Sequence, residues 1–192
     1  MAHPSPIDLL VLHAVRLKGF ADTAAVASRF GLDTDQTREE LLDAQAHGWV
    51  SRSSFADLAG WSLTGTGYRH NEAQLRDELN RAGAHGTVAA VHEQFLPLNV
   101  RATQVFTAWQ LDPGSSTDAF RQLADLASEL RDLERPLAAP LGRFAGYHDR
   151  FTAALAQADH DPAWITGIEV DSCHRVWFEL HEDLIATLGI TR

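Results

Sequence analysis

The sequence predicts a mainly α-helical protein made of two parts. Apolar residues recur at the three- and four-residue spacing of helices along most of the 192 residues. Short strand-like runs occur around residues 49–67, and the small residues of AGAHGT at 82–87 indicate a break between helices. We therefore expect two domains, residues 1–84 and residues 85–192, with enough apolar residues for a core in each.

Three helices are expected at the start of the chain. Each combines a stripe of apolar residues with residue types that favour helix ends, such as Asp or Thr at the N-cap and Gly just past the last turn. The expected ranges are 7–18, 23–30 and 34–47, with N-caps at Asp22 or Thr23 and at Thr34, and with ends at Gly31 and Gly48.

A short hairpin follows the third helix. WVSRSS at 49–54 and WSLTGTG at 61–67 have the composition of two strands, and FADLAG at 55–60 has the composition of a turn between them. A helix rich in Glu, Arg and Leu is expected from about 68 to 81. The first part therefore has the order of three helices, a hairpin and a further helix.

This order resembles the winged helix-turn-helix domains of bacterial transcription regulators, and the MarR and PadR groups are the most similar. LLDAQAHGWVSR at 41–52 looks like the end of a recognition helix that enters the wing. WSLTGTGYRH at 61–70 is similar to the Leu-Thr-x-x-Gly segment that leads into the next helix in these regulators. The resemblance covers about residues 7 to 82, and it implies a homodimer that binds double-stranded DNA.

If the resemblance holds, TDQTREELLDA at 34–44 lies in the major groove with its first turns facing the bases. Gln pairs well with adenine and Arg with guanine, and residues near the wing reach phosphates or the minor groove. The expected DNA-binding residues are Gln36, Thr37, Arg38, Ser51, Arg52 and Ser53, with Arg29 and Arg69 as further backbone contacts.

Charge supports an alternative for this winged helix. The expected recognition helix carries four carboxylates and one basic residue, and the whole chain has a net charge of −10. Phosphates repel acidic side chains, so a DNA-binding protein this acidic must gather its positive charge locally. The alternative is an interaction module that docks another protein and does not bind DNA.

The second part predicts four amphipathic helices with short connections, which favours an antiparallel four-helix bundle. Turn and capping residues in DPGSST and ADHDP mark two of the connections. The expected helices are 88–110, 117–135, 140–158 and 172–188.

Several polar side chains fall on the inward faces of these helices. In the last helix, Glu179, Glu182 and Asp183 fall on the opposite side and are expected to face solvent. Buried polar groups cost free energy unless they are paired, so the inward set indicates a pocket for a small-molecule effector. The expected effector-binding residues are His92, Asn99, Trp109, His148, His174, Trp177, Phe178 and His181.

Two other readings of the inward residues stay open. One is a core network in which the histidines satisfy each other and nearby groups. The other is a metal site formed by His92, His148 and His174 with Cys173 or His181. Spacings of seven residues disfavour the metal site, because two helical turns span about 10 Å. We therefore predict no metal.

Enzymatic motifs are not found in the sequence. It contains no phosphate-binding loop, dinucleotide-binding glycine pattern or nucleophile elbow, so we expect no cofactor and no enzyme, with a His-centred hydrolase as the alternative. The single cysteine fits a reducing cytoplasm, and no apolar run is long enough for a membrane span. We predict a cytoplasmic DNA-binding transcriptional regulator whose helical bundle binds a small effector or mediates dimerisation.

Overall fold

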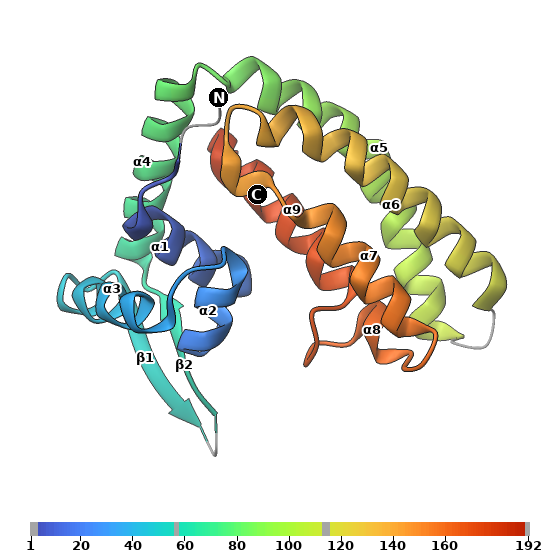
Figure 1. The fold of residues 1–192 in the computed structure, drawn as a ribbon, viewed down its shortest axis with the longest axis horizontal. Coiled ribbons are helices and arrows are strands. Elements are labelled where there is room, and N and C mark those ends of the chain that lie inside the picture. Colours follow the sequence, from blue (N-terminus) through green and yellow to red (C-terminus); the bar gives the residue numbers. More distant parts are fainter. Residues whose placement is uncertain (1–3, 56–57, 113–115, 191–192) are drawn as a thin grey trace.

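In the computed structural model of the chain, which describes residues 4–55, 58–112 and 116–190, the protein is mainly helical with a two-stranded antiparallel sheet (Figure 1). We call residues 4–82 the N-terminal part and residues 85–190 the C-terminal part. The elements of the N-terminal part are α1 (Ile7–Lys18), α2 (Thr23–Arg29), α3 (Thr34–Ala46), β1 (Val50–Phe55), β2 (Leu58–Leu63) and α4 (Gly65–Ala82).

Three helices of the N-terminal part, α2, α3 and α4, begin at side-chain caps, whereas α1 follows Pro6 without one. Asp22, one of the two caps that the sequence predicted for α2, accepts a hydrogen bond from the amide of Ala25 at 2.8 Å. Asp33 accepts one from the amide of Gln36 at 2.9 Å, so the cap of α3 lies one residue before the predicted Thr34. A side-chain oxygen at the N-cap satisfies an amide that the helix leaves unpaired.

The predicted second strand ends earlier than expected, because TGTG starts α4. Thr64 caps this helix by accepting a hydrogen bond from the amide of Gly67 at 3.0 Å. A Cβ atom on Gly67 would lie 1.9 Å from the carbonyl oxygen of Trp49, so the close approach of α4 to the residue before β1 requires glycine. The hairpin pairs Val50 with Leu63 through Phe55 with Leu58, so the described residues of FADLAG belong to the strands and not to the expected turn. Residues 56–57 lie outside the described residues.

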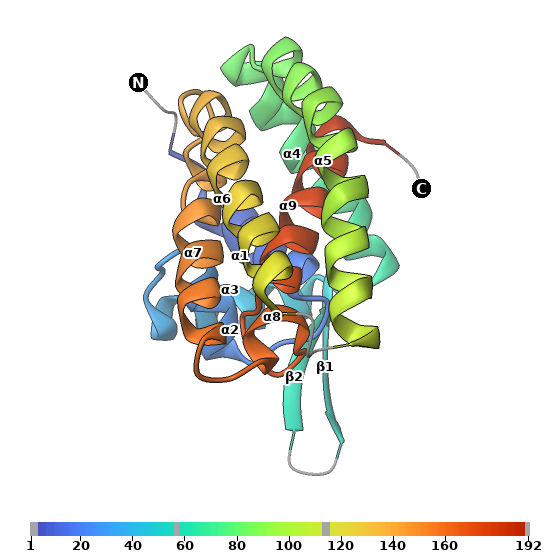
Figure 2. The same ribbon diagram turned by 90° about the vertical axis from the view of Figure 1, so that its right-hand side faces the viewer.

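The C-terminal part consists of long helices that pack as a closed ring of neighbours. α5 packs against α6, α6 against α7, α7 against α9, and α9 against α5 (Figure 2). Phe95, Phe144, Tyr147 and Phe151 are fully buried and fill the space between the helices. The elements are α5 (His85–Leu111), α6 (Ser116–Ala138), a 3-10 turn η1 (Gly142–Phe144), α7 (Tyr147–Ala158), α8 (Ala163–Thr166) and α9 (Cys173–Leu188).

The predicted helix 140–158 is interrupted, which corrects the expected position of His148. η1 ends at Phe144, and Gly146 adopts φ 94° before α7 begins. The break shifts the helical phase, so Tyr147 is fully buried in the core, while His148 points toward Arg131 of α6 with its side chain 15% exposed. Part of the predicted DPGSST loop lies outside the described residues.

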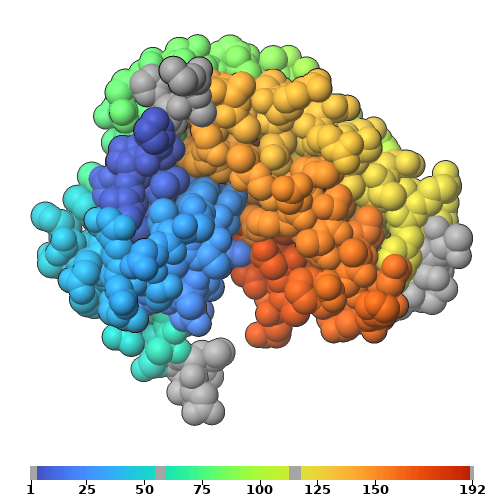
Figure 3. Space-filling model, viewed as in Figure 1, coloured from blue at the N-terminus to red at the C-terminus, as the bar shows by residue number. Residues whose placement is uncertain are grey.

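Helix α9 contacts both parts of the chain. It packs against α5, α7 and α8 on one side and against α1 and α4 on the other. Leu9 of α1, Leu75 of α4 and Ala186 of α9 form a small apolar cluster where the parts meet. In the face shown in Figure 3 the two parts touch over a broad area and separate near the hairpin. Burial on both sides explains why α9 holds so few exposed residues.

None of the helices in the described residues combines the length and the apolar character needed to cross a membrane.

Candidate functional site

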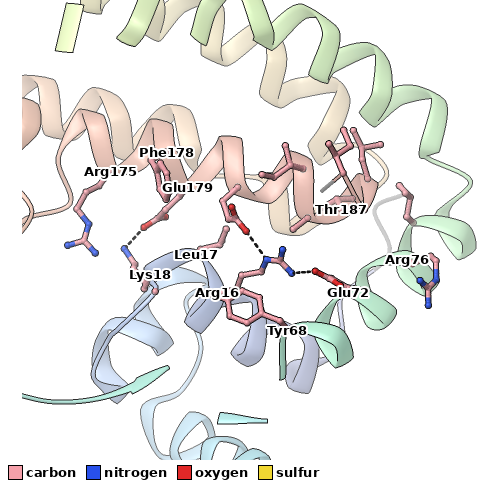
Figure 4. A pocket seen from close by; sticks show the side chains of 18 of the residues that line it. Arg16, Leu17, Lys18, Tyr68, Glu72, Arg76, Arg175, Phe178, Glu179 and Thr187 are labelled. Carbon is pink, nitrogen blue, oxygen red and sulfur yellow. Dashed lines mark hydrogen bonds and ion pairs between the residues drawn. The ribbon is translucent and has the colours of Figure 1, made fainter. Parts of the chain in front are cut away.

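A cleft of about 920 Å³ lies where α1 and α4 of the N-terminal part face α9 (Figure 4). Tyr68 and Leu79 of α4 and Phe178 and Ile185 of α9 supply apolar surface. Charged side chains, including Arg16 of α1, lie among them. A volume of several hundred Å³ and a mainly apolar lining with a few polar groups are typical of small-molecule sites.

Ion pairs connect the walls of the cleft. The guanidinium of Arg16 lies 2.8 Å from Glu182 of α9 and 3.3 Å from Glu72 of α4. The ammonium of Lys18 lies 2.8 Å from Glu179 (Figure 4). It also lies 2.9 Å from Asp171. These pairs hold the end of α1 against α4 and α9.

Glu179 is buried beneath the cleft and is surrounded by cations. Its side chain is 2% exposed, and its carboxylate lies 3.1 Å from Nε of Arg29 and 2.7 Å from Nη2 of Arg150, in addition to Lys18. The guanidinium of Arg29 also stacks between the rings of Phe30 and Tyr147, at 4.4 and 4.5 Å from their centroids. A single carboxylate of α9 therefore binds α1, α2 and α7 together.

Asp183, one turn further along α9, is the centre of a second buried group. Its carboxylate accepts hydrogen bonds from Arg143 of η1 and, at 2.9 Å, from the hydroxyl of Tyr147, and it lies 3.0 Å from Nε2 of His13. Arg143 also donates to Glu78 of α4 at 2.8 Å and to Thr187 at 2.7 Å. Each of these partners is buried, so water does not screen the charges.

The surroundings fix the protonation states in this group. Burial alone would raise the pKa of Asp183, but Arg143, His13 and Arg29 hold it well below its usual range. Burial lowers the pKa of His13 from its ordinary value of 6.5, although Asp183 opposes this shift. Near neutral pH, Asp183 is therefore ionised and His13 is neutral.

The expectation that Glu179, Glu182 and Asp183 face solvent is wrong. Glu179 and Asp183 are 1% and 0% exposed, and the side chain of Glu182 is 14% exposed. Helical periodicity placed the three carboxylates correctly on one side of α9, opposite the side that packs into the core of the C-terminal part. That side is covered by the N-terminal part, whose cations come from distant segments of the chain.

The predicted effector-binding residues do not meet in one pocket. His174 and Phe178 line the cleft. Other members pack between α9 and α5: Trp177 donates to the side-chain oxygen of Asn99 at 3.0 Å, and the ring of His181 lies 5.2 Å from that of Phe95. Elsewhere, Trp109 packs against Phe120, His148 faces α6, and His92 is partly buried on α5.

The surroundings of Cys173 bear on the metal-site alternative and on the reactivity of its thiol. Within the described part of the chain, no three His, Cys, Asp or Glu side chains come close enough together to hold a metal ion. Cys173 is buried with its sulfur 3.7 Å from the carbonyl oxygen of Phe151, and burial raises the pKa of its thiol to about 12. A thiol with so high a pKa is a poor nucleophile at neutral pH.

Most of the predicted DNA-binding residues are exposed, and the exceptions are Thr37 and Arg29. Thr37 is fully buried and its hydroxyl donates to the carbonyl oxygen of Asp33 at 2.7 Å, so the expectation that it reads bases is wrong. Arg38 is exposed and pairs with Asp35 at 2.6 Å. Arg29 is also excluded as a phosphate contact, because it is buried against Glu179. The exposed members are Gln36, Arg38, Ser51, Arg52 and Ser53, together with Arg69.

Sequence reasoning missed His13, Glu78 and Arg143, which hold the second buried group. His13 offered a signal, because it lies inside the apolar stripe of IDLLVLHAVRLK, where a polar side chain needs a buried partner. Glu78 offered none, because it stands among charged residues typical of a surface, and for Arg143 the apolar neighbours Leu141 and Phe144 did not reveal which face of the turn is buried.

The chain matches no protein-family model, no curated protein and no solved structure.

Proposed function

We propose that the protein is a DNA-binding transcriptional regulator in which a small effector binds in the cleft between its two parts. The position of the cleft carries this proposal, since its walls come from α1 and α4 on one side and from α9 on the other. A ligand there contacts both parts at once. It therefore favours the arrangement of the two parts that it fits best.

The order and packing of the elements support the corresponding fold. In this proposal α1, α2, α3 and the hairpin form a winged helix, with α3 as recognition helix and β1 and β2 as wing. α5, α6, α7 and α9 form a four-helix bundle, consistent with their ring of neighbours. Residues 1–84 and 85–192 are then the two domains, joined through α4.

DNA contact in this proposal uses the exposed face of α3 and the hairpin. Gln36 and Arg38 face the bases, and Ser51, Arg52 and Ser53 face the backbone. Two copies in a homodimer present two recognition helices to adjacent half-sites. The effector changes DNA affinity by changing how each winged helix is held against its bundle.

A fluorescence-anisotropy titration with DNA from the region upstream of the protein's own gene tests this function. We expect sequence-dependent binding that weakens steeply between about 50 and 200 mM salt. Arg38→Ala is expected to abolish sequence preference, while Arg101→Ala on α5, an exposed arginine remote from α3, leaves it unchanged. Absence of binding at the lowest salt concentration would count against the regulator.

A protein-docking module is the second candidate, and the charge of α3 favours it. Asp35, Glu39 and Asp43 are exposed on this helix, and its one arginine already pairs with Asp35. The variant Asp35→Asn separates the two functions. In a regulator it frees Arg38 and removes a repelling charge, so DNA affinity rises about two- to fivefold. In a docking module neither form of the protein binds DNA.

A further inference from the structure

Exposed apolar side chains gather around the cleft. Tyr68, Ile168, Phe178 and Ile190 line it and are 38%, 74%, 47% and 44% exposed. Tyr68 comes from α4, Phe178 from α9, and Ile168 and Ile190 from the segments before and after α9. Folding therefore brings these four side chains together at one concave surface. Apolar surface concentrated in a cavity is typical of a ligand site, and it selects a ligand with an apolar body.

The acidic residues of the cleft are already compensated. Each of the cleft residues Arg16, Lys18 and Glu179 forms ion pairs with neighbouring charged side chains. The ion pairs form two separate groups. In one, Arg16 pairs with Glu72 and Glu182, and in the other, Lys18, Arg29 and Arg150 pair with Asp171 and Glu179. Together the two groups hold four cations and four carboxylates.

Two further arginines line the cleft outside this balance. Arg76 of α4 and Arg175 of α9 form no ion pair with any described residue, although Arg175 donates to the carbonyl oxygen of Ile168. Figure 4 shows the two side chains at opposite ends of the cleft, away from the pairs in its middle. His174 adds no third cation near neutral pH, because burial lowers its pKa below the ordinary value of 6.5.

We infer that the cleft binds an organic anion with an apolar body, and that its acidic group pairs with Arg76 or Arg175, at one end of the cleft or the other. This inference rests on the proposed function, because it names the chemical class of the effector. An arginine without an ion-pair partner among the described residues at each end of the cleft contrasts with the net charge of −10 on the chain. A neutral or cationic ligand of the same shape gains nothing from the two arginines.

Two fluorescent probes with the same aromatic body test the inference on the full chain. Anilinonaphthalene sulfonate carries one negative charge, and phenylnaphthylamine carries none. We expect the sulfonate to bind one site per chain and more tightly than the neutral probe. Arg76→Ala combined with Arg175→Ala is expected to lower sulfonate affinity by about fivefold or more and to leave the affinity of the neutral probe unchanged.

Matched variants locate the site and test the charge requirement separately. Arg81→Ala removes an exposed arginine of α4 outside the cleft, so it should change neither affinity. Asn80→Trp places a bulky side chain at an exposed position that lines the cleft, and it should weaken both probes. Circular dichroism of each variant checks that the helical content is retained.

The outcomes distinguish the anion inference from the proposed function beneath it. If Asn80→Trp displaces both probes but the double arginine variant keeps the preference for the sulfonate, the cleft is a site and the anion class is wrong. The same conclusion holds if the neutral probe binds the wild-type protein as tightly as the sulfonate. If Asn80→Trp displaces neither probe, both the anion inference and the placement of the effector in the cleft fail.

Discussion

The imidazole Nε2 of His13, in the first helix, lies 3.0 Å from the carboxylate of Asp183, in the last helix, and both side chains are fully buried. The pair joins the N-terminal part directly to α9, and Arg143 and Tyr147 complete its surroundings. Buried charges are costly to leave without partners. The orientation of α1 on α9 is therefore fixed by polar contacts as well as by apolar packing.

Replacing Asp183 by Asn should lower the free energy of unfolding by about 3 to 5 kcal/mol, because Arg143 then loses a charged partner in a dry environment. Urea denaturation followed by circular dichroism measures this. A milder change, Tyr147→Phe, removes one hydrogen bond to Asp183 and should cost about 1 kcal/mol. As a control, Asp149→Asn alters a carboxylate that is 90% exposed and should change stability by less than about 0.5 kcal/mol. Equal effects of the Asp183 and Asp149 variants would falsify the assignment.

The free energy of unfolding should fall as the pH is lowered from about 6.5, because of the titration of His13. Burial lowers the pKa of His13 in the folded protein, with Arg143 and Arg29 adding to this and Asp183 opposing it. Between the folded pKa and 6.5 the unfolded chain binds a proton that the folded protein excludes, so acid favours unfolding by up to about 1.4 kcal/mol per pH unit.

Urea denaturation at a series of pH values from 7.5 downward, about half a unit apart, measures this slope. His13→Gln cannot titrate, so its slope should be smaller than that of the wild type, whatever its absolute stability. His174 keeps part of the slope, since burial lowers its pKa as well. Asp183 contributes at lower pH, below its ordinary value of 3.8, as the pH approaches its depressed folded pKa. Identical slopes for the wild type and His13→Gln would contradict the prediction.

Thr37 should affect stability and not DNA affinity, because its side chain lies on the buried face of α3. Thr37→Val keeps the shape and removes the hydrogen bond to Asp33, at an expected cost of about 0.5 to 1.5 kcal/mol. Thermal unfolding and the DNA titration described above, run on the same sample, separate the two effects. A loss of DNA affinity in Thr37→Val without loss of stability would place this side chain at the DNA surface after all.

Cys173 should resist thiol reagents in the folded protein. Its thiol is buried, and the pKa of about 12 leaves little thiolate at pH 8. Ellman's reagent should therefore react slowly with the native protein and fully after addition of urea, with one thiol per chain. Rapid reaction of the native protein would show that α9 opens readily and that its burial is only transient.

Much of the secondary structure was predictable from local patterns. The stripes of apolar residues, the cap at Asp22 and the glycines at 31 and 48 depend on neighbours within a few residues. The break at Gly146 was missed because the apolar spacing of Leu141, Phe144 and Phe151 continues across it, as though the helix were unbroken. The break shifts the helical phase by one residue. As a result Tyr147 enters the core and His148 does not.

The candidate site depends on long-range packing. The sequence by itself determined that DSCHRVWFELHEDL forms a helix with an apolar side and an acidic side, because helical periodicity is a local property. Only the tertiary structure decided that the acidic side is buried. The cations that compensate Glu179 and Asp183 come from α1, α2, η1 and α7, and periodicity within one helix carries no information about which distant segment packs against it.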